Sequence, residues 1–139
     1  MAESAAAPRR RVLIVDDEES MRMLLARIVS SELDVEAQLA GTCEQALRMA
    51  AATPYDAILL DLLMPGVGGL GVLRQIRAAS ANQATPVLVV SVLADAATVA
   101  RCVSAGADAH HAKPIRRAEL AAAVKALIAG RGRPKPRKG

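Results

Sequence analysis

Aromatic residues are almost missing from this 139-residue sequence, which has no Phe or Trp and a single Tyr, Tyr55. The apolar residues, 53% of the chain, must therefore build a core from Ala, Val, Leu, Ile and Met. Base stacking on aromatic side chains, a common means of binding single-stranded nucleic acid, is excluded. The composition predicts one globular domain with an aliphatic core.

Long hydrophobic runs are also missing, because the longest apolar stretches have four or five residues. A helix that spans a bilayer needs about 20 such residues. The Ala-rich N-terminus has no apolar segment typical of a signal peptide. We therefore expect a cytoplasmic protein with no membrane insertion.

Cysteine is scarce as well. Cys43 and Cys102 fall in helix-like segments and lack the spacing of metal ligands. We expect buried, reduced thiols rather than a disulfide or a redox pair.

The net charge of +4 comes from one end of the chain. Residues 131–139 hold five of the 18 basic residues and no acidic one, which leaves 13 basic against 14 acidic residues elsewhere. We predict a flexible N-terminal extension over 1–9, a single domain over 10–129 and a disordered basic tail over 130–139. For the tail, a solubilising end or a linker is favoured over binding to nucleic acid or an acidic protein.

Short apolar runs alternate with amphipathic helical segments along the domain. Continuous, β-branched-rich runs predict strands buried on both faces, and two weaker runs complete a set of five. The predicted strands are 12–15, 35–39, 57–60, 87–90 and 107–112. This order predicts an α/β fold: a doubly wound, five-stranded parallel sheet of the flavodoxin-like (βα)5 kind, with helices on both faces.

Signals at the helix ends support this division. Thr42 and Gln45 have the spacing of a capping box, which predicts the start of the second helix. Gly106 and Gly130 stand where a left-handed residue would end the fourth and fifth helices. The third helix is expected from about Gly69 to Ala79.

Polar residues follow the predicted strands at the edge where such sheets bind their ligands. Asp16 and Asp17 follow the first strand, Asp61 follows the third, Ser91 the fourth, and the fifth ends at Lys113. Three converging carboxylates either have raised pKa values or share a cation, and oxygen ligands suit Mg²⁺. Each residue alone has an ordinary explanation, such as a helix cap or a strand-end hydroxyl, but their joint placement favours phosphoryl chemistry on a carboxylate.

Four segments resemble the receiver domains of two-component signalling, over roughly residues 10–129. They are Val12-Leu-Ile-Val-Asp-Asp-Glu-Glu19, Asp61-Leu-Leu-Met-Pro-Gly-Val-Gly-Gly69, Ser91, and Gly106-Ala-Asp-Ala-His-His-Ala-Lys-Pro114. The resemblance implies a signalling switch of the stand-alone type rather than an enzyme, with self-catalysed phosphotransfer and slow autodephosphorylation. Its phosphodonor would be a sensor histidine kinase or a histidine phosphotransfer protein.

The resemblance also implies a role for each matching residue. Asp61 would be the phosphoacceptor, and Ser91 and Lys113 would hold phosphoryl oxygens. Mg²⁺ would be bound by Asp61, Asp17, Asp16 through water, and the backbone carbonyl of Leu63. The Lys113–Pro114 bond would be cis, which is plausible because the second residue is proline. Phosphorylation would act on an unidentified downstream protein, with a weak homodimer as an option, through the face formed by the fourth helix, fifth strand and fifth helix.

Three features depart from the family pattern. His110 replaces the usual aromatic switch residue, so it is either a partly exposed strand residue or a relay that bonds Ser91 or meets a partner. Val92, Leu93 and Leu63 add apolar cover near the acceptor, which predicts slow turnover of the phosphoryl group. Extra glycines after Pro65 predict a mobile loop.

Two alternatives remain open at this point. One is a pseudo-receiver, an interaction module that binds its partner without phosphorylation. The other is a receiver fragment of a longer regulator. The five intact positions of the predicted site favour the phosphorylation switch over the pseudo-receiver.

Overall fold

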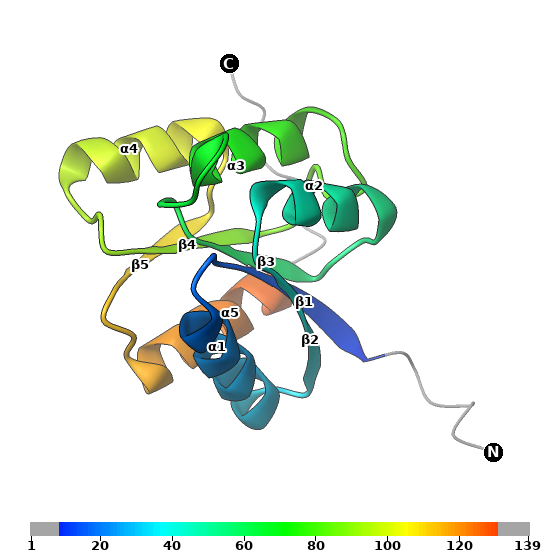
Figure 1. Ribbon diagram of the computed structural model, residues 1–139. Helices are drawn as coiled ribbons and strands as arrows, with labels where there is room; N and C mark the ends of the chain where they lie inside the picture. Colours follow the sequence, from blue (N-terminus) through cyan, green and yellow to red (C-terminus); the bar gives the residue numbers. More distant parts are fainter. Residues whose placement is uncertain (1–8, 131–139) are drawn as a thin grey trace.

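Five parallel strands form one sheet in the computed structural model, which describes residues 9–130 (Figure 1). The strand order is β2-β1-β3-β4-β5, which confirms the doubly wound, flavodoxin-like sheet. The predicted extension and basic tail lie, except for their innermost residues, outside the described residues. The strands are β1 (Arg10–Val15), β2 (Val35–Ala40), β3 (Ala57–Leu60), β4 (Val87–Ser91) and β5 (Ala109–Ala112).

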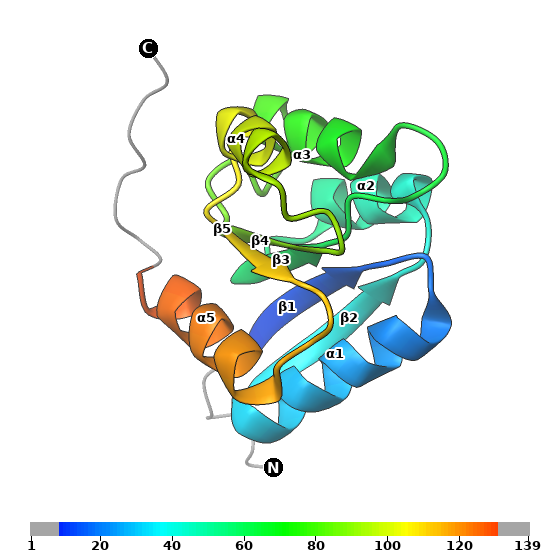
Figure 2. The same ribbon diagram turned by 90° about the vertical axis from the view of Figure 1, so that its left-hand side faces the viewer.

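Helices cover both faces of the sheet, as Figure 1 and Figure 2 show: α1 and α5 lie on one face, and α2, α3 and α4 on the other. Their bounds are α1 (Glu19–Glu32), α2 (Cys43–Ala52), α3 (Gly68–Ala78), α4 (Ala96–Ala105) and α5 (Arg117–Ala129). Each strand is followed by a helix, and every strand pair is parallel, so all five strands end at the same edge of the sheet.

Two aliphatic clusters form the core, one on each side of the sheet. Along β1, Leu13 and Val15 pack into the cluster beneath α2, α3 and α4, whereas Val12 and Ile14 pack into the cluster beneath α1 and α5. This alternation follows from the two-residue period of a strand. It explains why the central strands read as continuous apolar runs, since both of their faces are buried.

Two of the predicted helix boundaries are confirmed. The Thr42 hydroxyl accepts the backbone N–H of Gln45 at 3.0 Å and caps α2. Gly106 ends α4 in the left-handed region, with φ of +111°. Gly130 was predicted to do the same for α5 and does not: its φ is −84°, in the right-handed region. Its N–H still bonds the Ala126 carbonyl, so the last turn closes without a left-handed residue.

Strand register brings the polar ends together. Val15 pairs with Leu60, so Asp16 and Asp61 leave neighbouring strands at the same level. Ser91 pairs with Ala112, which places Lys113 beside the end of β4. The predicted fifth strand began too early, because the N–H of Ala107 bonds Cys102 in the cap of α4 and pairing starts at Ala109.

Both cysteines are free and buried, as expected. None of the helices in residues 9–130 has the length and apolar character that a bilayer crossing requires.

Candidate functional site

Three carboxylates meet at the carboxyl edge of the sheet. One ligand oxygen from each of Asp16, Asp17 and Asp61 lies within 4.8 Å of the others. Asp16 and Asp61 are buried, and Asp17 is exposed. Like charges at this separation repel one another, so the cluster suits a hard divalent cation that prefers oxygen ligands.

Lys113 supplies the positive charge next to this cluster. Its Nζ lies 3.0 Å from Oδ2 of Asp16 and 3.7 Å from Oδ2 of Asp61. The bond to Asp16 is the shorter, and the second Asp16 oxygen accepts the backbone N–H of Glu18 at 2.9 Å. One amine faces three carboxylates, which leaves the site with an excess of negative charge.

Burial raises the pKa of the Asp61 carboxyl above its usual value. The Lys113 charge acts in the opposite direction, and the charges of Asp16 and Asp17 raise this pKa further. A backbone N–H of Leu63, 3.4 Å from Oδ1, adds only a weak opposing bond. Asp61 is therefore a partly desolvated carboxylate, whose charged form is stabilised by an added cation.

This pKa shift predicts a stabilising substitution. Because the folded chain holds the Asp61 proton more tightly than the unfolded chain, wild-type stability falls as pH rises from the ordinary Asp value of 3.8 through the raised value. In metal-free buffer at neutral pH, Asp61→Asn should increase the free energy of unfolding, and the gain should shrink as the pH is lowered to 3.8.

Urea unfolding at several pH values measures this difference. The matched control is Asp34→Asn, at a carboxylate with a side chain 93% exposed, which should change little. A lower free energy of unfolding in Asp61→Asn at neutral pH would show that the Asp61 charge does not destabilise the fold.

Ser91 ends β4 and is fully buried. Its hydroxyl oxygen accepts the backbone N–H of Leu93 at 3.1 Å, so it is oriented by the β4–α4 loop. A hydroxyl that already accepts one bond keeps its proton for another acceptor. The position suits a donor to an anion at this edge of the sheet.

His110 lies on β5 and is partly exposed. Its Nε2 lies 2.9 Å from the carbonyl oxygen of Leu93, rather than bonding the Ser91 hydroxyl that one of the two sequence interpretations named. A carbonyl only accepts, so Nε2 carries the proton in this contact. Ser91 and His110 therefore both bond the backbone of Leu93 in the β4–α4 loop, Ser91 at the N–H and His110 at the carbonyl oxygen.

Three apolar side chains that follow Asp61 or Ser91 closely in the sequence are exposed in the fold. Leu63 is 52% exposed, Val92 60% and Leu93 37%. Each lies one or two residues beyond Asp61 or Ser91, on the loops that leave the carboxyl edge. The Lys113–Pro114 peptide bond on the neighbouring loop is cis.

Gly69 is a structural residue whose role the sequence analysis missed. A Cβ at this position would overlap the carbonyl oxygen of Asp61 and lie 2.7 Å from Cα of Leu62. Gly66 and Gly68 have positive φ values, of 91° and 75°. Backbone conformation and close approach thus give these three glycines a structural role. The mobility of the loop stays a prediction. The spacing of these glycines after Pro65 was the available signal.

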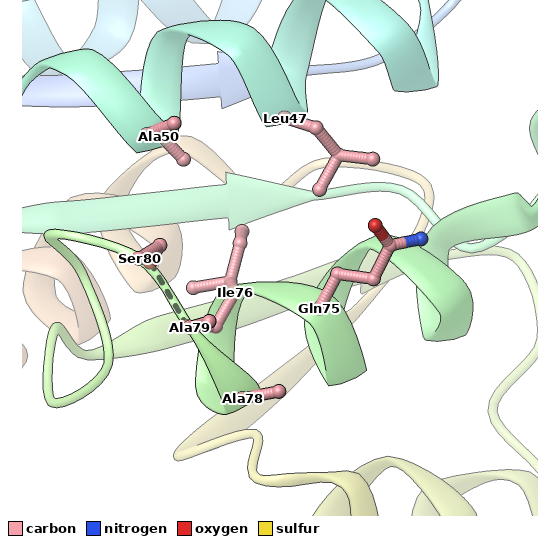
Figure 3. Close-up of a pocket in the computed structure, with 8 residues that line it drawn as sticks. Leu47, Ala50, Gln75, Ile76, Ala78, Ala79 and Ser80 are labelled. Atoms are coloured by element: carbon pink, nitrogen blue, oxygen red, sulfur yellow. Dashed lines mark hydrogen bonds between the residues drawn. The ribbon is translucent and has the colours of Figure 1, made fainter.

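Away from the acidic cluster, a hollow between α2 and α3 has a volume of about 300 Å³ (Figure 3). It is lined by Leu47, Ala50, Ala51, Gln75, Ile76, Ala78, Ala79 and Ser80. None of these lining residues is ionisable, and the Ser80 hydroxyl, just after α3, donates to the Ile76 carbonyl and accepts the backbone N–H of Asn82. This hollow therefore offers no ionisable group for catalysis or metal binding.

Comparison with known proteins agrees with this geometry. The family model described as the response regulator receiver domain matches residues 12–125. The sensory/regulatory protein RpfC of Xanthomonas campestris is 38% identical over 112 residues, which cover 79% of this chain and 15% of RpfC. In two other curated relatives, the response regulator ArlR of Staphylococcus saprophyticus and the transcriptional regulatory protein ResD of Bacillus subtilis, the match spans 52% and 48% of the relative's length.

Two solved structures are also similar. The receiver domain of sensor histidine kinase PA1611 from Pseudomonas aeruginosa, with a magnesium ion in its active-site cleft, has a TM-score of 0.80 at 28% identity, over 88% of this chain and all of that one. A response regulator from Burkholderia pseudomallei with a phosphorylated aspartic acid has a TM-score of 0.76 at 26% identity, over 86% and 69%. The matched segment contains the whole acidic cluster and Lys113, and the chain belongs to the response regulator receiver domains of two-component systems.

Proposed function

We propose that this chain is a phosphorylation-dependent switch that accepts a phosphoryl group on Asp61. The observation that carries the proposal is the meeting of Asp16, Asp17 and Asp61 with Lys113 at one edge of the sheet. The phosphorylated aspartate of the Burkholderia relative supports the same chemistry. The donor would be a sensor histidine kinase or a histidine phosphotransfer protein, and the site would be cytoplasmic.

The residues present fit a divalent cation, because three carboxylate oxygens lie together and the single amine of Lys113 leaves them with an excess of negative charge. Asp17, Asp61, the Leu63 carbonyl and, through water, Asp16 would hold Mg²⁺, the ion that the PA1611 receiver domain contains. Bound there, Mg²⁺ would neutralise charge on the transferring phosphoryl oxygens.

The chain's own groups would perform the remaining steps. An oxygen of Asp61 forms a bond to phosphorus while the bond from phosphorus to the donor imidazole nitrogen breaks, and that nitrogen keeps the electron pair. The Lys113 amine, already within 3.7 Å of Asp61, is placed to meet a phosphoryl oxygen as a point charge. The buried Ser91 hydroxyl would donate to another of these oxygens.

Intact-mass measurement after incubation with acetyl phosphate and Mg²⁺ tests this function. We expect the wild type to gain the mass of one phosphoryl group and Asp61→Asn to gain none. Asp34→Asn, a carboxylate lost far from the cluster in sequence and exposed to solvent, should still be modified. Unchanged mass of the wild type would favour the pseudo-receiver, which binds its partner without phosphate.

Turnover of the phosphoryl group should be slow. Val92 and Leu63 are more than half exposed beside the acceptor loops, where their side chains would hinder an attacking water. Val92→Ala should shorten the lifetime of the phosphorylated form several-fold, measured as loss of the added mass after the donor is removed. A wild-type lifetime of seconds that Val92→Ala leaves unchanged would contradict this expectation.

The output would act through the face of α4, β5 and α5. His110 lies on this face and bonds the Leu93 carbonyl, so movement of the β4–α4 loop toward a phosphoryl group would alter its contact. His110→Ala should weaken the dependence of partner binding, or of a weak homodimer, on phosphorylation. Equal affinities of wild type and variant in both phosphorylation states would remove His110 from the relay.

A further inference from the structure

Arg22 on α1 reaches back over the end of β1. Its Nη1 donates to the backbone carbonyl oxygen of Asp16 at 2.8 Å, in a partly buried position. A hydrogen bond from a guanidinium to a carbonyl oxygen is charge-assisted and therefore stronger than one between neutral groups. The side chain thus links the helix to the peptide that joins Asp16 and Asp17.

Gly41 provides the space for this contact. A Cβ at Gly41, just after β2, would lie 2.7 Å from Nη1 of Arg22 and 3.1 Å from Cζ. The backbone of Gly41 is itself fixed, because its N–H donates to Oε1 of Gln45 at 2.9 Å. The guanidinium is therefore seated against the β2–α2 loop.

The contact acts on Asp17 through the peptide plane. The Asp16 carbonyl and the Asp17 N–H belong to one planar peptide unit. A bond that holds the carbonyl oxygen therefore also fixes the orientation of the Asp17 N–H and the position of the Asp17 Cα. The Asp16 side chain already has its own partners in Glu18 and Lys113. Asp17 is the exposed member of the cluster, so its direction depends most on its backbone.

Resting on the proposed function, we propose that Arg22, seated against Gly41, is a positioning residue that orients the Asp16–Asp17 peptide for divalent-cation binding. Outer-shell contacts of this kind orient metal ligands and strengthen metal affinity. The positive charge of Arg22 alone would repel a cation, so the two effects have opposite signs and can be separated by measurement.

Calorimetric titration of the full chain with Mg²⁺ alone is the first test. Arg22→Ala should raise the Mg²⁺ dissociation constant about tenfold, and Arg22→Lys should fall between it and the wild type. The control is Arg27→Ala, which removes an equal charge from an exposed position of the same helix and should leave the constant unchanged.

Gly41→Ala provides a second, independent variant. It should weaken Mg²⁺ binding in the wild-type background by displacing the guanidinium, and have no further effect in Arg22→Ala, where that side chain is gone. In acetyl phosphate reactions, Arg22→Ala should need more Mg²⁺ for half-maximal rate and reach about the wild-type rate, within about twofold, at saturation.

An equal or lower dissociation constant in Arg22→Ala would overturn the inference, as would a loss of rate that saturating Mg²⁺ does not restore. Additive effects of the Gly41 and Arg22 substitutions would show that Gly41 does not act through the position of the Arg22 guanidinium. If the wild type itself does not bind Mg²⁺, the proposed function fails as well. If the wild type binds Mg²⁺ and Arg22→Ala binds it equally well, only the role of Arg22 is contradicted and the proposed function stands.

Discussion

Lys113→Ala should slow phosphorylation of the protein by about 100- to 1000-fold, the effect expected for loss of one preorganised charge at a developing anion. Lys113 is the cation within 3.7 Å of both buried carboxylates, Asp16 and Asp61. Without it, the pKa of Asp61 should rise further, because the Lys113 charge is the main influence that lowers it. The phosphoryl oxygens would also lose the positive charge that neutralises them during transfer.

Initial rates with acetyl phosphate at saturating Mg²⁺ measure this effect. The matched control is Lys125→Ala, which removes the same side chain from an exposed position on α5 and should not change the rate. A Lys113→Ala rate within about twofold of the wild type would show that the amine has no part in the transfer.

Gly69→Ala should disrupt the acceptor strand end and the whole fold together. The added methyl group would need the space that the Asp61 carbonyl oxygen and Leu62 Cα occupy, and both belong to backbone that cannot rotate away. Forcing backbone apart in a packed interior should reduce the free energy of unfolding by about 3 kcal/mol. Phosphorylation of Asp61 should fall with it, since Asp61 sits at the displaced segment.

Gly71→Ala is the control for this substitution, because it makes the same change two residues later in α3. A Cβ there meets the side chain of Val67, which is 55% exposed and can move, and alanine favours the helix. We expect stability within about 1 kcal/mol of the wild type. Urea unfolding of the two variants compares them directly, and equal stabilities would contradict the packing argument for Gly69.

The sequence predicts the sheet well because its strands are buried on both faces. Short, continuous, β-branched-rich apolar runs such as Val12–Val15 are typical of such strands. The weaker edge strand β5 was predicted two residues too long, since Ala107 is apolar but bonds the end of α4. Local apolar character does not distinguish a strand residue from a helix-capping one.

The site residues could be located from the sequence because each follows a strand directly. Asp61 and Lys113 needed only the rule that parallel strands end at one edge. Arg22, Gly41 and Gly69 could not be found in this way, because their effects depend on contacts between segments that only the fold brings together. The prediction of a left-handed Gly130 was wrong because a glycine permits a left-handed conformation but does not require one.

The Asp61 carboxylate itself should form the acyl phosphate. Borohydride reduces an acyl phosphate to an alcohol, so treatment of the phosphorylated protein, followed by peptide mass mapping, identifies the modified side chain. We expect residue 61 alone to be converted to homoserine, and only in samples that received both the phosphodonor and Mg²⁺. Conversion at Asp16 or Asp17 in place of Asp61, or stable modification of a serine or histidine with no reducible carboxylate, would contradict the account.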